Sequence, residues 1–176
     1  MLLFNKPNNY TLEQNLQLQL MNRLNAILDQ LEAKISIYEV VNTTVSSKAI
    51  GWHIEHTLLT VNGIIHALHK SNPKDYKWKF NMVRLLVLSR KQIPRGKAKA
   101  PEIVLPKETI EERQLLLHLA KARLKIEELA NLEANHFFYH PLCGNLKLDQ
   151  TISFLEIHSN HHLAIIKDIA NAQIST

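Results

Sequence analysis

Apolar side chains recur at intervals of three and four residues along four long stretches, and this periodicity constrains the fold more than any other feature. Such spacing places side chains on one face of an α-helix, so we expect helices over about 11–38, 47–70, 109–133 and 149–169. The chain has only 4 glycines and 6 prolines in 176 residues, which argues against a turn-rich β-sandwich. The sequence therefore predicts an all-α fold, a four-helix bundle with a long connection between its second and third helices.

Short polar side chains mark the places where these helices should begin. The expected N-cap residues are Thr11, Ser46 or Ser47, Thr109 with Glu112 completing a capping box, and Asp149. The stretch NHFFYHPLCGNLKL, residues 135–148, is expected to be a structured connection into the last helix.

Residues 71–106 interrupt the helical pattern. KFNMVRLLVLSR resembles a short helix, and KQIPRGKAKAPEIVLP, with three of the six prolines, predicts an irregular arm outside the bundle. Between Lys70 and Lys99 lie ten basic residues and one acid, a charge of +9, whereas the remaining residues carry 11 basic and 15 acidic groups, or −4. A solvated arm is the favoured interpretation. The alternative is a surface for nucleic acid or an acidic partner, although no nucleic-acid motif accompanies the charge.

The length indicates a single domain, residues 1–176. Cys143 is the one cysteine, so an internal disulfide is excluded. No apolar run reaches the roughly 18 residues that a membrane span needs, and the N-terminus lacks the apolar stretch of a signal peptide. We therefore expect a cytoplasmic protein without a membrane partner.

Three histidines fall within five positions of the last helix. Each helical residue turns the chain by about 100°, so His158 and His162 share its apolar face while His161 lies at the edge of that face. Two imidazoles at i and i+4 can converge on one ion. Buried imidazoles otherwise need hydrogen-bond partners.

The second helix offers two more candidates. His56 lies on a face of small residues, which include Ala49, Thr60, Gly63 and Ala67, and His53 lies between that face and the apolar stripe. His66 and His69 fall on the polar arc. Spacing alone supports two interpretations equally: a three-histidine metal site, with His53 or His56 from this helix, or internally hydrogen-bonded core histidines.

These residues resemble the DinB/YfiT-like superfamily of four-helix-bundle metalloenzymes. The resemblance is carried by His56, by the H-x-x-x-H of the last helix, and by the segment with His140, Pro141, Gly144 and Leu146 before it. It implies that His56, His158 and His162 bind one divalent ion, and imidazole ligands suit zinc or nickel. It also implies a metal-dependent transferase or hydrolase whose small-molecule substrate could be a low-molecular-weight thiol, and it allows a homodimer.

The sequence identifies no catalytic side chain and no substrate. Glu55 and Glu156 are expected at the surface, His140 in a structural role, Cys143 as an inert thiol, and Trp52 in a pocket wall or in the core. The rival hypothesis is a non-enzymatic binding protein with structural histidines, whose basic arm engages nucleic acid or an acidic partner.

Overall fold

The computed structural model describes residues 12–95, 101–107 and 109–172. This part of the chain is mostly helical, as predicted, and contains five α-helices and one β-hairpin. The helices are α1 (Leu12–Glu32), α2 (Ile50–Lys70), α3 (Met82–Arg90), α4 (Glu112–Glu128) and α5 (Leu148–Asn171). Strands β1 (Phe137–His140) and β2 (Gly144–Lys147) pair antiparallel.

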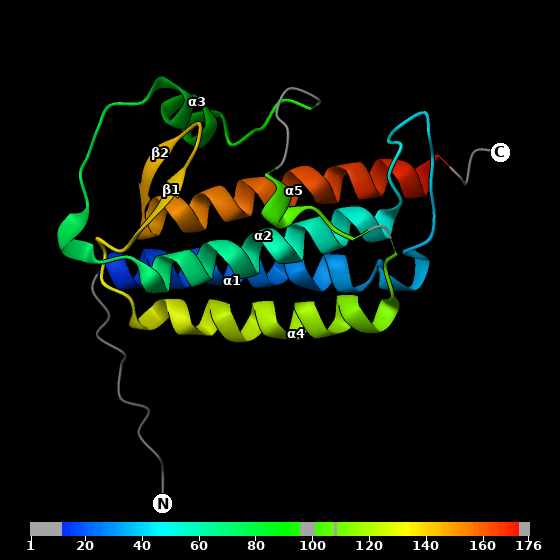
Figure 1. Cartoon of the computed structure of the whole chain (residues 1–176), viewed down its shortest axis with the longest axis horizontal. Coiled ribbons are helices and arrows are strands. Elements are labelled where there is room, and N and C mark those ends of the chain that lie inside the picture. The colour runs from blue at the N-terminus through cyan, green and yellow to red at the C-terminus, as the bar shows by residue number, and fades with distance from the viewer. Residues whose placement is uncertain (1–11, 96–100, 108, 173–176) are drawn as a thin grey trace, which may run out of the picture.

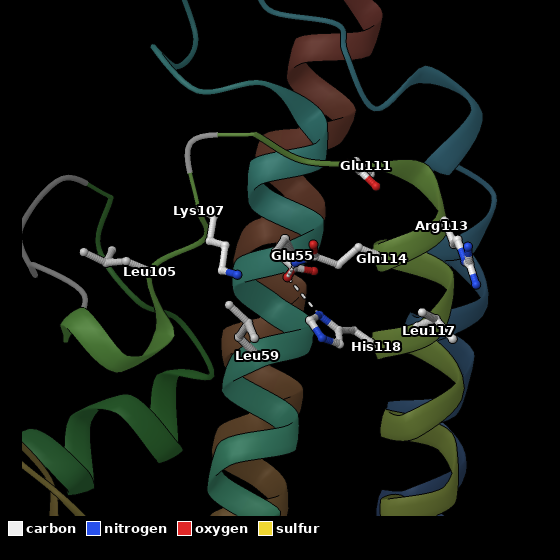
Figure 2. Close-up of a pocket in the computed structure, with 9 residues that line it drawn as sticks. All are labelled: Glu55, Leu59, Leu105, Lys107, Glu111, Arg113, Gln114, Leu117 and His118. Carbon is white, nitrogen blue, oxygen red and sulfur yellow. Dashed lines mark hydrogen bonds and ion pairs between the residues drawn. The ribbon is translucent and has the colours of Figure 1, made fainter.

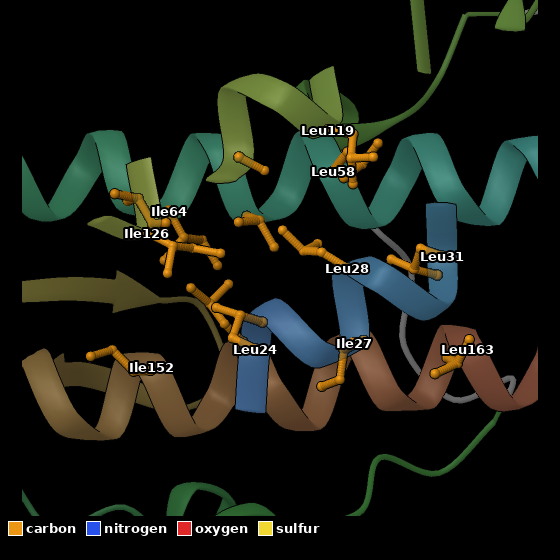
Figure 3. Packing of buried hydrophobic residues seen from close by; sticks show 14 of the residues in the cluster. Leu24, Ile27, Leu28, Leu31, Leu58, Ile64, Leu119, Ile126, Ile152 and Leu163 are labelled. Carbon is orange, nitrogen blue, oxygen red and sulfur yellow. The ribbon is translucent and has the colours of Figure 1, made fainter. Parts of the chain in front are cut away.

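The four long helices lie side by side, and α3 and the hairpin lie together outside them (Figure 1). Helix α1 packs against α5 and α4, and α2 packs against α4 and α5, so the four enclose one core. Figure 3 shows Leu24 and Leu28 of α1 meeting side chains from α2, α4 and α5. Both leucines are fully buried, and each contributes about 1.5–3 kcal/mol through the apolar surface that it removes from water.

The first helix is shorter than its pattern predicted. It ends at Glu32, and the 3₁₀ turn η1 (Ile35–Ile37) follows, with Ile35 buried in the core. A hydrogen bond holds this turn against the start of α2, because the Tyr38 carbonyl accepts from the Gly51 amide at 2.7 Å. A β-carbon at Gly51 would lie 3.0 Å from that oxygen, so the close approach needs glycine.

Three of the predicted N-caps are wrong. Ala49, Glu111 and Lys147 occupy the N-cap positions of α2, α4 and α5. Tertiary contacts decide two of these starts: Ser46 faces His53 instead of capping, and α5 begins directly from strand β2, which places Asp149 in its first turn. Thr11 lies outside the described residues.

The all-α prediction missed the hairpin, although it expected structure at 135–148. Gly144 has a φ of 68°, which favours glycine, and it closes the turn. The His140 Nδ1 accepts from the amides of Leu142 and Cys143 at 3.1 and 3.2 Å. His140 therefore has the structural role that was expected.

The interruption at 71–106 runs outside the four long helices, as predicted (Figure 1). It holds η2 (Pro73–Asp75), α3 and η3 (Glu102–Val104), and residues 96–100 lie outside the description. Helix α3 packs on α5 and bonds to the hairpin, and η3 packs on α2, so the described arm is anchored to the rest of the chain. Within the described part of the chain, no helix combines the length and the apolar character that crossing a bilayer requires.

Candidate metal centre

Three histidines from two helices converge at the interface of α2 and α5. His56, His158 and His162 each present a ring nitrogen, and these three nitrogens lie within 4.8 Å of one another. Nitrogens that bind one zinc ion at roughly 2.0–2.1 Å lie about 3–4 Å apart, so small side-chain rotations would complete the site. The sequence placed the same three residues together.

Burial keeps these imidazoles uncharged. His56 and His162 are 3% and 8% exposed. Desolvation lowers the pKa of His56, and it lowers that of His162 further, with help from the neighbouring histidines. The same causes lower the pKa of His158 from 6.5 to about 3. The rings are therefore in the neutral form that binds metal ions.

A backbone carbonyl fixes the tautomer of His56. Its Nδ1 lies 2.8 Å from the carbonyl oxygen of Val104 in η3. Because a carbonyl can only accept, the proton is on Nδ1 and the lone pair is on Nε2. A hydrogen bond of this kind is the usual outer support of a metal-binding histidine.

His53 supports His162 in a similar way and does not replace His56. The two Nδ1 atoms of His53 and His162 are 3.1 Å apart, and the His53 Nε2 lies 3.0 Å from the hydroxyl of Ser46. That hydroxyl oxygen already accepts from the Lys48 amide. If the Nε2 of His53 donates to Ser46, the Nδ1 of His53 has a lone pair and accepts from the Nδ1 of His162. The Nε2 of His162 then keeps a free lone pair. If Ser46 instead donates to His53, the Nδ1 of His53 donates to His162, and the proton of His162 is on its Nε2.

One buried nitrogen of the site has no hydrogen-bond partner. It is the Nδ1 of His158, which is shielded from solvent. Buried polar atoms are usually paired, and an unpaired imidazole nitrogen at this place is compatible with a bound ion. The residues present therefore fit a divalent metal, and a set of imidazole ligands suits zinc and nickel.

Aromatic rings flank the histidines. Trp52 stacks on His56 with centroids 5.2 Å apart and planes 13° apart, and Phe154 stacks on His158 at 6.0 Å. Trp52 therefore contacts the histidine cluster directly, and Phe154 contacts it from α5.

Three other residues that the sequence singled out do not belong to the group of convergent nitrogens. His161 is half-buried, with its ring beside that of His162. Cys143 is 2% exposed, as expected for a buried thiol, and burial raises the pKa of its thiol, which disfavours the reactive thiolate. Glu156 is partly exposed and pairs with Arg23 at 3.0 Å.

The expectation that Glu55 lies at the surface is wrong. Its side chain is 1% exposed, and its Oε1 accepts from Gln114 and from the Nδ1 of His118, each at 2.8 Å. Helix α4 covers the side of α2 that carries Glu55, which one helix considered alone could not show. Figure 2 shows this cluster in a cavity of about 690 Å³, with Leu105 and Lys107 on its other side.

His118 and Gln114 were missed by sequence reasoning. Their i, i+4 spacing on one face of α4 was the available signal, but nothing in the sequence paired them with Glu55. The second oxygen of Glu55, Oε2, is buried and has no hydrogen-bond partner.

A scan against protein-family models found no match, and searches of the curated proteins and of the solved structures found no similar protein.

Proposed function

We propose that this chain is a metal-dependent enzyme of the DinB-like four-helix-bundle type, with one divalent ion held by His56, His158 and His162. The observation that carries the proposal is the convergence of the three nitrogens within 4.8 Å. Three protein ligands leave coordination positions open for water or substrate, as catalytic sites require. Zinc or nickel is the proposed ion.

When bound, such an ion would lower the pKa of a water molecule or of a substrate thiol and so supply a nucleophile at neutral pH. The chain's own residues prepare the site. Val104 holds the lone pair of His56 on Nε2, and His53, by donating to Ser46, does the same for His162. Trp52 and Phe154 shield the rings.

The proposed reaction is a transfer or a hydrolysis, and a low-molecular-weight thiol is the proposed substrate class. The proposal includes a cytoplasmic location and allows a homodimer. These parts depend on the resemblance to the DinB/YfiT-like superfamily and on the chemistry of a three-imidazole site.

The rival proposal is a binding protein in which the histidines are structural. One observation favours it: the run from Ser46 through His53 to His162 already pairs three side chains without an ion. The close approach of the three ring nitrogens argues against it, whereas the unpaired Nδ1 of His158 does not decide between the two, because the Oε2 of Glu55 is unpaired as well.

Metal analysis of the purified protein separates the two. We expect about one equivalent of zinc or nickel in the wild type and none in the His158→Ala, His162→Ala variant. The matched control is His66→Ala, an exposed histidine of α2 that should leave the metal content unchanged. Metal-free wild-type protein that also fails to take up added zinc or nickel would overturn the proposal.

A further inference from the structure

Helix α3 exposes four of its apolar side chains and buries one of its two arginines. Arg84 is 6% exposed, whereas Met82, Val83, Leu85 and Leu86 are between 41% and 54% exposed. A surface helix usually does the reverse. The outward face of α3 is therefore an apolar surface without a partner in the described part of the chain.

Polar bonds to the hairpin hold α3 in this orientation. Arg84 donates to the carbonyl of Asn145 at 2.7 Å and to the carbonyl of Lys79. Asn81 accepts from the Arg84 amide at 2.8 Å and donates to the carbonyl of Leu142 at 3.0 Å. Turning the helix to bury its leucines would break these bonds, so the outward apolar face is a fixed feature of the fold.

The segment before α3 enlarges this surface. Trp78 and Phe80 are 65% and 64% exposed. Trp78 also lies near the guanidinium of Arg84, 6.0 Å from ring centroid to Cζ, which ties the segment to the helix. Exposed apolar groups that gather in this way mark interaction sites more often than chance exposure does.

The same stretch is uniformly basic. Residues 76–95 contain six lysines and arginines and no acid. Lys77, Lys79, Arg90 and Lys91 are all exposed. An apolar helix face with lysines and arginines around it, next to an exposed tryptophan, is the pattern of a segment that lies in a membrane interface.

We propose that α3 and the segment before it bind the surface of an anionic lipid bilayer, with Trp78, Phe80, Met82 and Leu85 in the headgroup boundary and the basic side chains at lipid phosphates. Charge complementarity favours this occupant. A symmetric contact with a second copy would bring the same cations together. The phosphates of a nucleic acid would pair with the basic side chains. They would leave the four exposed apolar side chains of α3 in contact with water. The sequence predicted no membrane partner because it has no segment long enough to span a bilayer. Binding to a bilayer surface does not require such a segment.

Vesicle co-sedimentation of the full chain tests this proposal. We expect binding to vesicles of phosphatidylcholine with phosphatidylglycerol, weak binding to phosphatidylcholine alone, and a blue shift of tryptophan fluorescence that Trp78→Ala abolishes. The Leu85→Ser, Leu86→Ser variant should bind on the order of tenfold more weakly. The matched control is Leu116→Ser, Leu117→Ser, which changes two neighbouring exposed leucines of α4.

Equal loss of binding in both leucine variants would overturn the proposal, as would equal binding to neutral and anionic vesicles. Binding to double-stranded DNA but not to vesicles would assign the surface to nucleic acid. A dimer that dissociates in the Leu85→Ser, Leu86→Ser variant would assign it to a second copy. None of these outcomes depends on bound metal, so failure here leaves the proposed function untouched.

Discussion

Adjacent residues of α2 carry two buried polar clusters: Glu55 faces α4, and His56 faces α5. The Glu55 cluster pairs a carboxylate with two donors, Gln114 and His118. The His56 cluster gathers three rings, each with a nitrogen within 4.8 Å of the other two. Each cluster leaves one buried atom without a hydrogen-bond partner, the Oε2 of Glu55 and the Nδ1 of His158. The difference teaches that the two clusters suit different partners: a carboxylate suits hydrogen-bond donors, whereas a set of neutral imidazoles suits a cation.

The largest expected effect is the loss of stability at low pH, to which the histidine cluster should contribute most. Burial lowers the folded-state pKa of His53 to about 4 and that of His158 to about 3, from 6.5. The unfolded chain therefore takes up protons first, so this stability is present above about pH 6.5 and is lost as the pH falls toward 4. The lowered pKa of His53 alone corresponds to about 3 kcal/mol of the free energy of unfolding.

Urea unfolding between pH 7 and pH 4, with and without chelator, measures this. The pH dependence of the free energy of unfolding should be clearly smaller in the His158→Ala, His162→Ala variant. Bound metal should add stability at pH 7 that shrinks toward pH 5, because protons compete for the imidazoles. Identical curves for wild type and variant would contradict the assignment of these histidines.

The next effect sharpens the comparison from the Glu55 side. Glu55→Ala removes the acceptor of His118 and Gln114 and should lower the free energy of unfolding by about 2 kcal/mol while leaving the metal content unchanged. Glu111→Ala, at an exposed position in the lining of the same cavity, should change stability by less than about 0.5 kcal/mol. Metal loss in Glu55→Ala would show that the two clusters are not independent.

A smaller effect separates ligands from their supports. His53→Ala should retain the metal but weaken its affinity by roughly 10–100-fold, because His162 loses the partner that fixes its tautomer. Competition titration with a chromophoric chelator gives the affinity, and His66→Ala provides the baseline. An unchanged affinity would mean that the 3.1 Å contact between His53 and His162 has no role in binding.

The smallest effect concerns a histidine outside both clusters. His140→Ala removes the acceptor of two turn amides and should lower the melting temperature by the equivalent of about 1 kcal/mol. Metal content and affinity should stay at wild-type values. A change in either would bring His140 into the site.

Much of this site was predictable, because its information is local. Periodicity predicted the four long helices, and the i, i+4 spacing predicted that His158 and His162 lie together. Spacing left His53 and His56 open as the third residue, and the resemblance to the DinB/YfiT-like superfamily favoured His56. Glu55 shows where local information stops. Its position on α2 marked it as polar surface, and only the packing of α4 against that side buries it.

Two contacts could not be predicted from the sequence either: the hydrogen bond of His56 to the Val104 carbonyl, and the contact between His53 and His162. Each joins residues that lie far apart in the chain, 48 and 109 positions respectively. The hairpin was missed because its strands have only four residues each, too few for an alternating pattern to stand out.

The stretch 101–107 touches both clusters, since Val104 holds His56 while Leu105 and Lys107 line the cavity of Glu55. A segment held at a few points opens more often than a packed helix does. Each opening would release the His56 ring to rotate. If the site binds an ion, the rate at which that ion dissociates would then follow the opening rate of this stretch. The dissociation rate would therefore be set separately from the affinity of the site for the ion.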